Sequence, residues 1–242
     1  MSQSIITNVK VTIIIPAYNE RNSIENTING VVAYFQAREN PYEIIVYADG
    51  NDGTREIVAK MSETNPRIII MGNIERRGKG YGIHQAVLAA HGQIIGFIDA
   101  DNKTPFTEFE KFTPYFQQGY DVVIGSRGHR ESIIEQRQPF YRRLGSKGFA
   151  IYMHLVMGLW DIMDTQCGFK FFRAETAHDL FGRQKIDGYM FDVEIIYLAR
   201  RSNYKIHQVP IRWRDDRDSR LNLLGGNIQN FIDIIRIRFF SG

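Results

Sequence analysis

The chain has 242 residues, of which 43% are hydrophobic and 24% charged, as is ordinary for a soluble globular protein. The formal net charge of +3 is too small to indicate a nucleic-acid-binding protein, and the basic residues are interspersed with acids. The one cysteine, Cys167, excludes an intrachain disulfide and a multi-cysteine metal cage, so a reducing, cytoplasmic setting is expected. Since no run of 18 apolar residues and no signal-peptide pattern occur, we expect no membrane-spanning segment, although the chain could lie on a membrane.

Strand and helix patterns alternate along the first half of the chain. Short β-branched runs predict strands, and apolar residues three or four apart predict helices. The predicted strands cover 11–15, 43–47, 67–71, 94–99 and 121–125, and the predicted helices cover 24–38, 55–62, 78–90 and 106–118. We expect the first strand to stop at Pro16. This alternation indicates crossover units and predicts an α/β protein with a mostly parallel sheet.

The pattern changes after Gly125. A polar, arginine-rich segment over 126–139 is long enough for a functional loop. The remaining chain predicts helices over 140–160, 190–201 and 227–240, and strands over 168–172 and 204–214. Because no linker, repeat or low-complexity segment occurs, we expect residues 1–242 to form a single domain.

Two aspartates, Asp99 and Asp101, follow the apolar run 94–98. Binding loops follow the C-terminal ends of buried parallel strands. Carboxylates in such a loop can hold a hard divalent cation through oxygen, if a substrate diphosphate supplies the remaining ligands. The alternative is a polar turn after a strand, since Asp-x-Asp is a common short motif.

The loops after the first two predicted strands would lie at the same edge of the sheet. The first holds Pro16, Tyr18 and Glu20, and the second begins at Asp49. An aspartate there can accept a hydrogen bond from a nucleobase N–H, while the proline and tyrosine shape a flat pocket. Ordinary turn chemistry at Asp49-Gly50 is an equally good interpretation.

Two segments carry basic residues suited to phosphate. Residues 76–80, Arg-Arg-Gly-Lys-Gly, open a predicted helix, where glycines permit close backbone approach and basic side chains attract anions; a solvated turn is the alternative. Residues 127–147 hold six basic and two acidic side chains. The apolar, aromatic stretch that follows favours either an anionic membrane surface or a core helix with a solvated basic face.

Asp192 and Glu194 are two residues apart on a predicted helix. Since such residues do not share a helix face, we expect at most one of them to point into a site. The last predicted helix, 227–240, is apolar enough to serve a core, a partner or a lipid surface.

Taken together, these segments resemble family 2 glycosyltransferases, and within them the dolichyl-phosphate mannose and glucose synthases. The resemblance covers nearly the whole chain, through the segments 15–20, 49–54, 77–80, 99–101, 125–127, 164–170 and 191–194. The segment Asp-Thr-Gln-Cys-Gly-Phe-Lys at 164–170 is specific and looks closest to the glucose-transferring branch.

The resemblance implies a GT-A fold, a Rossmann-like fold of nucleotide-diphospho-sugar transferases, with donor binding in 1–125 and acceptor binding in 126–242. It implies an inverting, Mg²⁺- or Mn²⁺-dependent transfer of a hexose, glucose before mannose, from a UDP- or GDP-hexose to a polyprenyl or dolichyl phosphate. Peripheral association with the cytoplasmic face of a membrane goes with that acceptor.

The resemblance also implies roles for individual residues. Donor contacts are expected from Pro16, Tyr18, Glu20, Asp49, Lys79, Asp99, Ala100, Asp101, Gln166, Ser219 and Arg220. Within this set Asp99 and Asp101 stand at the metal, with Asp101 the more direct ligand. The acceptor phosphate is expected at Arg127, Arg142 and Arg143.

Several alternatives stay open. Ala48 stands where the family usually has the first aspartate of Asp-Asp-Gly-Ser, and the turn is shorter, so the base preference is not fixed. A phosphate acceptor needs no strong base, whereas a saccharide hydroxyl would need one, from Asp192, Glu194 or Asp164. A nucleotidyltransferase and a non-catalytic sugar-nucleotide-binding protein are the competing classes.

Overall fold

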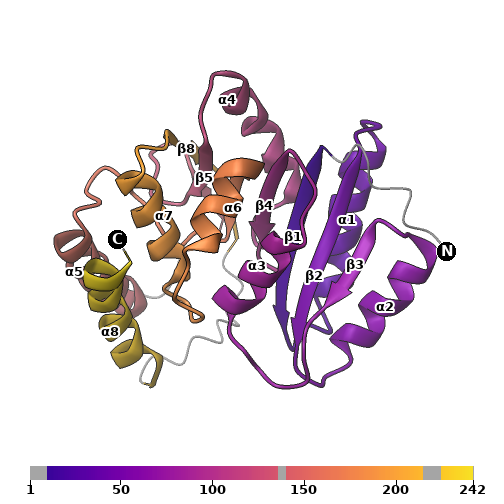
Figure 1. The fold of residues 1–242 in the computed structure, drawn as a ribbon, viewed down its shortest axis with the longest axis horizontal. Helices are drawn as coiled ribbons and strands as arrows, with labels where there is room; N and C mark the ends of the chain where they lie inside the picture. The colour runs from indigo at the N-terminus through magenta and orange to yellow at the C-terminus, as the bar shows by residue number, and fades with distance from the viewer. Residues whose placement is uncertain (1–9, 136–139, 215–224, 242) are drawn as a thin grey trace.

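The computed structural model describes residues 10–135, 140–214 and 225–241, with only the backbone described for 140–147 and 225–227. At its centre lies a seven-stranded sheet in the order β3-β2-β1-β4-β7-β5-β8 (Figure 1). A second, two-stranded sheet pairs β6 with β9. The strands are β1 Val11–Tyr18, β2 Tyr42–Asp49, β3 Ile68–Met71, β4 Ile94–Ile98, β5 Val122–Ser126, β6 Ile133–Ile134, β7 Phe169–Arg173, β8 Ile206–Pro210 and β9 Arg212–Trp213.

Helices cover both faces of the large sheet (Figure 1). Side chains of successive strand residues point to opposite faces, so Ile14 packs with α3, α6 and α7 while Ile13 and Ile15 pack with α1, α2 and η1. The helices are α1 Ile24–Gln36, α2 Thr54–Thr64, α3 Lys79–Leu88, η1 Phe106–Lys111, α4 Thr113–Gln117, α5 Phe140–Met157, α6 Ala174–Gly182, α7 Phe191–Arg201 and α8 Gly225–Phe240.

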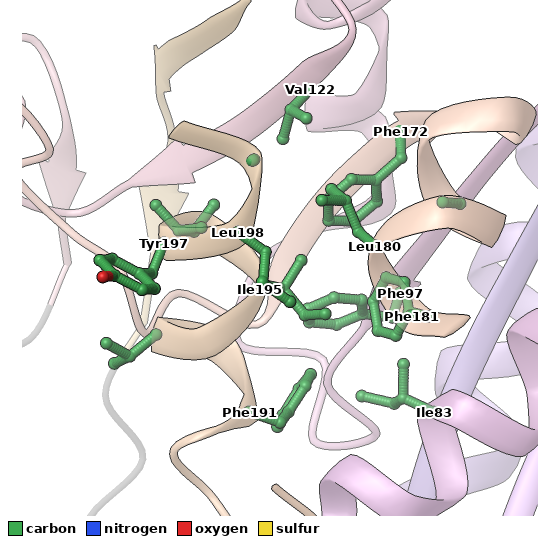
Figure 2. Close-up of a cluster of buried hydrophobic side chains, with 14 of the residues drawn as sticks. Ile83, Phe97, Val122, Phe172, Leu180, Phe181, Phe191, Ile195, Tyr197 and Leu198 are labelled. Carbon is green, nitrogen blue, oxygen red and sulfur yellow. The ribbon is translucent and has the colours of Figure 1, made fainter. Parts of the chain in front are cut away.

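One core cluster binds α3, α6 and α7 to the middle of the sheet (Figure 2). The ring of Phe97 in β4 lies 5.5 Å from that of Phe191 in α7 and 6.3 Å from that of Phe172 in β7. Aromatic pairs at these separations add to the stabilisation that burial provides. This packing fixes the starts of α3 and α7 beside the end of β4.

The prediction that β1 stops at Pro16 is wrong, because the strand continues to Tyr18. Pro16 pairs with Tyr47 of β2, while the pairing of β1 with β4 ends at Ile14. From there onward β1 has only one neighbour in the sheet. A residue without an N–H group is tolerated where a strand has a free side.

Three other predicted elements differ in extent. The helix over 106–118 is divided into η1 and α4, since Pro114 lacks the N–H that a continuous helix needs. The strand over 204–214 is divided into β8 and β9 after Pro210, and the helix from Phe140 ends at Met157, before Gly158 with its φ of +70°. The sequence patterns also missed α6, which follows β7 without a loop.

The strand β7 has a direction that matters for function. It runs antiparallel to both β4 and β5, whereas the other pairs in the large sheet are parallel. Residues that precede β7 therefore lie at the edge where β1, β2 and β4 end. The segment 164–168 is brought beside Asp99 by this reversal.

Candidate functional site

Asp99 follows β4 and stands over the glycine that precedes β7. Its N–H donates to the carbonyl oxygen of Gly168 at 3.0 Å, and its side chain is 41% exposed. A Cβ at Gly168 would lie 2.1 Å from Oδ2 of Asp99, so a side chain there would displace the carboxylate. The glycine is thus required for Asp99 to occupy this position.

Two lysines contact the aspartates after β4. Nζ of Lys79, the first residue of α3, lies 2.7 Å from Oδ1 of Asp99. Nζ of Lys103 lies 2.9 Å from Oδ2 of Asp101. Burial alone would raise the pKa of Asp99, but Lys79 beside it holds that pKa below the usual range. The carboxylate is therefore ionised at neutral pH.

A buried ion pair lies next to this cluster. Lys170 of β7 is fully buried and donates both to the carbonyl oxygen of Cys167 and to Oδ1 of Asp192 near the start of α7. Burial raises the pKa of Asp192, although Lys170 and Lys79 act in the opposite direction. Burial also raises the pKa of the Cys167 thiol to about 12, so this cysteine is an unreactive neutral group.

Arg127 and Asp164 form a two-pronged pair. Nε of Arg127 lies 2.7 Å from Oδ2 of Asp164 and Nη2 lies 2.9 Å from Oδ1, with the Arg127 N–H donating as well. Burial would raise the pKa of Asp164, but the guanidinium holds it below its usual value. Among the described residues Nη1 of Arg127 has no hydrogen-bond partner, and the side chain is 33% exposed. The exposed Gln166 donates its N–H to Asp164.

The structure does not bring Glu194 into this cluster. Its carboxylate is fully buried and accepts hydrogen bonds from the N–H groups of Lys185 and Ile186 and from Oγ of Ser241. Of the two carboxylates on α7, only Asp192 is near Lys79 and Asp99. This separation agrees with the expectation that at most one of them points into a site.

Asp49, at the end of β2, organises the segment that leads into α3. Its Oδ1 accepts from the N–H of Asn73 at 3.1 Å and its Oδ2 from the N–H of Arg77 at 2.7 Å. The side chain is buried. A nucleobase that contacts Asp49 would share these oxygens with the backbone.

Tyr18 is 40% exposed at the end of β1 and supports an arginine. The guanidinium carbon of Arg76 lies 4.5 Å from the centre of the Tyr18 ring, and Nη2 of Arg76 donates to the hydroxyl of Tyr189 at 2.9 Å. Arg76 therefore joins the β1 edge to the segment that precedes α7.

Other residues expected at the donor belong to the same edge but are hydrogen-bonded to nearby hydroxyl side chains. Glu20 accepts a hydrogen bond from Oγ of Ser23, and its N–H donates to Thr54. Ala100 is buried, and its carbonyl oxygen accepts from Thr27. Both positions shape the loops that hold the site.

Some expected contacts cannot be placed. Ser219 and Arg220 lie outside the described residues. Arg142 and Arg143 lie in the first turn of α5, where only the backbone is described. Their expected roles stay predictions.

The carboxylates of Asp99 and Asp101 fit a hard divalent cation. Both are partly exposed, and carboxylate oxygens are the ligands that Mg²⁺ and Mn²⁺ prefer. In the part of the chain that the structure describes, no three His, Cys, Asp or Glu side chains gather to hold a metal. Diphosphate oxygens would therefore have to complete the coordination.

The sequence patterns missed two partners of the expected site residues. Lys103 and Lys170 were not singled out, although each pairs with a carboxylate that was. Lys170 lies within the specific segment 164–170, and Lys103 stands two residues after Asp101. The short sequence distance between these lysines and the clustered carboxylates was the signal that could have predicted the pairs.

Comparison with protein families identifies the chain. The model described as "Glycosyl transferase family 2" matches residues 12–181, more than half of the chain. The chain belongs to glycosyl transferase family 2. The match includes β1 to β7, and with them Asp99, Asp101 and the Arg127–Asp164 pair.

Curated relatives within this family align over nearly the whole chain. A dolichyl-phosphate beta-glucosyltransferase of Trichomonas vaginalis is 32% identical, over 96% of this chain and 72% of its own length. One of Dictyostelium discoideum is 32% identical over 97% and 75%, and the human one is 28% identical over 96% and 76%.

Solved structures agree with the fold. The glucosyl-3-phosphoglycerate synthase of Mycobacterium tuberculosis, in complex with Mn²⁺, UDP and glucosyl-3-phosphoglycerate, superposes with a TM-score of 0.69 at 21% identity, over 95% of this chain and 80% of that one. The mannosyl-3-phosphoglycerate synthase of Rubrobacter xylanophilus gives 0.68 at 16% identity, over 95% and 73%. The chain has the GT-A fold, as the resemblance implied.

Proposed function

We propose that this enzyme transfers glucose from UDP-glucose to a dolichyl or other polyprenyl phosphate, with inversion at the anomeric carbon. The observation that carries the proposal is the meeting of Asp99, Asp101 and Lys79 with the segment 164–170 at one sheet edge. The names of the aligned relatives support glucose and the lipid phosphate. The UDP-glucose in a solved GT-A neighbour supports uridine as the base.

The donor half is proposed to be residues 1–125. Asp99 and Asp101 would hold Mg²⁺ or Mn²⁺, which when bound would neutralise charge that develops on the departing diphosphate. Lys79, at the first turn of α3, places an ammonium beside Asp99 and can donate to a diphosphate oxygen. Tyr18, with Arg76 over its ring, is partly exposed at this edge and is proposed to lie beside the nucleobase.

The acceptor half is proposed to be residues 126–242. Arg127 is held by Asp164 through Nε and Nη2, so its planar guanidinium has a fixed orientation. A fixed cation positions an anionic phosphate at little entropic cost. The phosphate is already ionised at neutral pH and attacks directly, so no strong base is needed. Asp192 is then an electrostatic partner of Lys170 rather than a proton acceptor.

A lipid acceptor also requires access to a membrane surface. α5 and α8 lie side by side, and the ring of Phe149 is 5.3 Å from that of Phe231 (Figure 1). Large apolar side chains are exposed along both helices, namely Ile151, Leu155, Ile228, Phe231, Ile232, Ile235, Phe239 and Phe240. The exposed Arg236 and Arg238 add positive charge. An apolar face with flanking arginines suits an anionic bilayer surface.

We therefore propose that the enzyme acts as a peripheral protein on the cytoplasmic face of a membrane. Within the described ranges, no helix is both long and apolar enough to cross a bilayer. Co-sedimentation with anionic vesicles tests the α5–α8 surface. Ile232→Asp with Phe239→Asp should abolish binding, whereas Leu88→Asp, at an equally exposed apolar residue on α3, should not.

A donor screen tests the activity itself. Purified protein, Mn²⁺ or Mg²⁺ and a short polyprenyl phosphate are incubated with UDP- and GDP-hexoses in turn, and nucleoside diphosphate and lipid product are measured by mass. We expect a glucosyl phospholipid from UDP-glucose. Nucleoside diphosphate without lipid product would indicate another acceptor, such as a saccharide hydroxyl. In a parallel incubation with a nucleoside triphosphate and a hexose 1-phosphate, release of pyrophosphate would indicate a nucleotidyltransferase. No reaction in any incubation would favour a binding protein.

A further inference from the structure

The buried carboxylate of Glu194 holds one short segment in place. Oε2 accepts from the N–H of Ile186 at 2.9 Å, and both carboxylate oxygens lie 3.1 Å from the nitrogen of Lys185. Backbone N–H groups bonded to an ionised carboxylate make strong hydrogen bonds. Residues 185–188, named here the bridging segment, are hydrogen-bonded to α7 through this side chain, and Ile186 also packs in the core cluster that contains α7.

The bridging segment lies directly against the start of α3. A Cβ at Gly78 would be 2.3 Å from the carbonyl oxygen of Asp187, and one at Gly80 would be 2.5 Å from that of Ile186. The N–H of Tyr81 donates to the same Asp187 oxygen at 3.2 Å. The two glycines thus allow backbone-to-backbone contact, and the first turn of α3 rests on the bridging segment.

This first turn carries the lysine of the donor site. Lys79 lies between Gly78 and Gly80, and its Nζ is 2.7 Å from Asp99. A shift of the bridging segment would move the backbone of Lys79 with it. Glu194 and Lys79 are therefore connected through residues 185–188.

The same carboxylate also contacts the end of α8. Oγ of Ser241 donates to Oε1 of Glu194, and Nζ of Lys185 donates to the carbonyl oxygen of Phe240. Ser241 is buried. The C-terminal helix and the first turn of α3 are thereby joined through one charged group.

We propose that Glu194 is a positioning residue for the donor site. It holds the bridging segment, the bridging segment holds the first turn of α3, and that turn presents Lys79 to Asp99 and to the donor diphosphate. The role in donor binding rests on the proposed function, whereas the link from Glu194 to α3 does not.

The test uses the full chain and three variants. Glu194→Gln removes the charge. Ser241→Ala removes only the hydrogen bond from Ser241 to Glu194 and leaves the contact between Lys185 and Phe240 in place. Glu43→Gln is the matched control, since Glu43 is also buried and accepts from Oγ1 of Thr12 and the N–H of His91, at the opposite edge of the sheet. Hydrogen exchange of the peptide 78–82 and the Kd for UDP with Mn²⁺ are measured for each.

In Glu194→Gln we expect exchange at 78–82 to rise and the Kd for UDP to increase about tenfold, as the loss of one charge-assisted hydrogen bond predicts. Ser241→Ala should also raise the exchange at 78–82 and the Kd for UDP, but by less than Glu194→Gln does. KM for the donor should rise while KM for the acceptor stays constant. Glu43→Gln should lower thermal stability but leave the exchange at 78–82 and the Kd for UDP at their wild-type values.

Two results would overturn the proposal. One is a hydrogen-exchange rate at 78–82 in Glu194→Gln that equals the wild-type rate. The other is a rise in the Kd for UDP in Glu43→Gln as large as the rise in Glu194→Gln. If the wild-type chain bound no nucleoside diphosphate, the proposed function would fall, and the exchange measurement would still decide whether Glu194 holds α3.

Discussion

Lys79 and Asp99 join two elements that are distant in sequence but adjacent at the sheet edge. The 2.7 Å contact between Nζ and Oδ1 connects the first residue of α3 to the loop after β4. Burial would lower the pKa of Lys79, but Asp99 and Asp192 raise it, so the ammonium is charged throughout the physiological range. A permanent cation beside the candidate metal ligands suits a diphosphate.

Lys79→Met should weaken donor binding. The substitution keeps most of the aliphatic chain but removes the ammonium, and loss of one charge-assisted hydrogen bond predicts a rise of about tenfold or more in the Kd for UDP. Titration calorimetry with UDP and Mn²⁺ measures this. An unchanged Kd would exclude Lys79 from the diphosphate site.

Asp101→Ala should abolish most turnover. Removal of one group that stabilises transition-state charge lowers kcat by about 100-fold or more. Nucleoside diphosphate release measured against Mn²⁺ concentration checks this. Asp52→Ala is the control, because Asp52 accepts from the N–H groups of Arg21 and Thr54 in a turn. Substantial turnover with normal donor affinity in Asp101→Ala would contradict its assignment to the metal.

Gly168→Ala should damage the site through Asp99. The added Cβ would lie within 2.3 Å of three carboxylate atoms, so the carboxylate must move. We expect a loss of about 1–3 kcal/mol in the free energy of unfolding, typical of overpacking, and a fall in Mn²⁺-dependent turnover. Gly182→Ala, at a helical glycine with nothing within 4 Å, should instead gain about 0.4–1 kcal/mol. Urea unfolding compares the two.

The sequence could predict the parts of the fold that depend on local pattern. Apolar runs located the strands β1 to β5, and helical spacing located α1, α3 and α7. It could not predict that Pro16 lies inside β1, since this depends on which neighbour the strand lacks there. The division of 106–118 could have been predicted from Pro114, because proline lacks the N–H that a continuous helix needs, but the helical spacing of the apolar residues favoured one helix.

The residues of the candidate site are expected from the family resemblance and its motifs, which say nothing of how those residues pair. Asp99, Asp101, Arg127 and Asp164 were all named, yet the Arg127–Asp164 pair joins residues 37 apart in sequence. Such a pair follows from the antiparallel direction of β7, which no periodicity encodes. Glu194 was expected as a base candidate, and only its backbone partners distinguish it from Asp192.

Arg127→Ala should raise KM for the acceptor more than KM for the donor. Its guanidinium is oriented by Asp164 through Nε and Nη2, which leaves Nη1 for the proposed acceptor phosphate. The loss of one charge-assisted hydrogen bond predicts a change of about 10-fold or more in acceptor KM. Steady-state kinetics with each substrate varied in turn measures the difference. An equal rise in both KM values would make Arg127 a structural arginine.

Asp164→Asn should lower stability in a pH-dependent way. Arg127 holds the pKa of Asp164 below its unfolded value of 3.8, so the stabilisation is complete above that value and is lost as the pH falls through the lower folded-state pKa. We expect a cost of about 1–3 kcal/mol at pH 7 that shrinks as the pH falls through the lowered folded-state pKa. Urea unfolding of both proteins from pH 7 downward measures it, and a cost independent of pH would contradict this origin.

Lys170 and Asp192 should be strongly coupled, because each is buried and each is the other's ionic partner. Breaking a buried pair from one side costs about 3–5 kcal/mol, so Lys170→Met and Asp192→Asn should each destabilise by this amount, while the double variant should cost less than the sum.

Burial raises the pKa of Asp192 above its unfolded value, and Lys170→Met would raise it further. A group with a raised folded-state pKa loses its stabilisation as the pH rises, so the cost of Lys170→Met should grow with pH. In the double variant the titrating carboxyl is absent, so this pH dependence should disappear. Urea unfolding of the four proteins at pH 5 and pH 8 completes the cycle, and additive costs would show that the two side chains act independently.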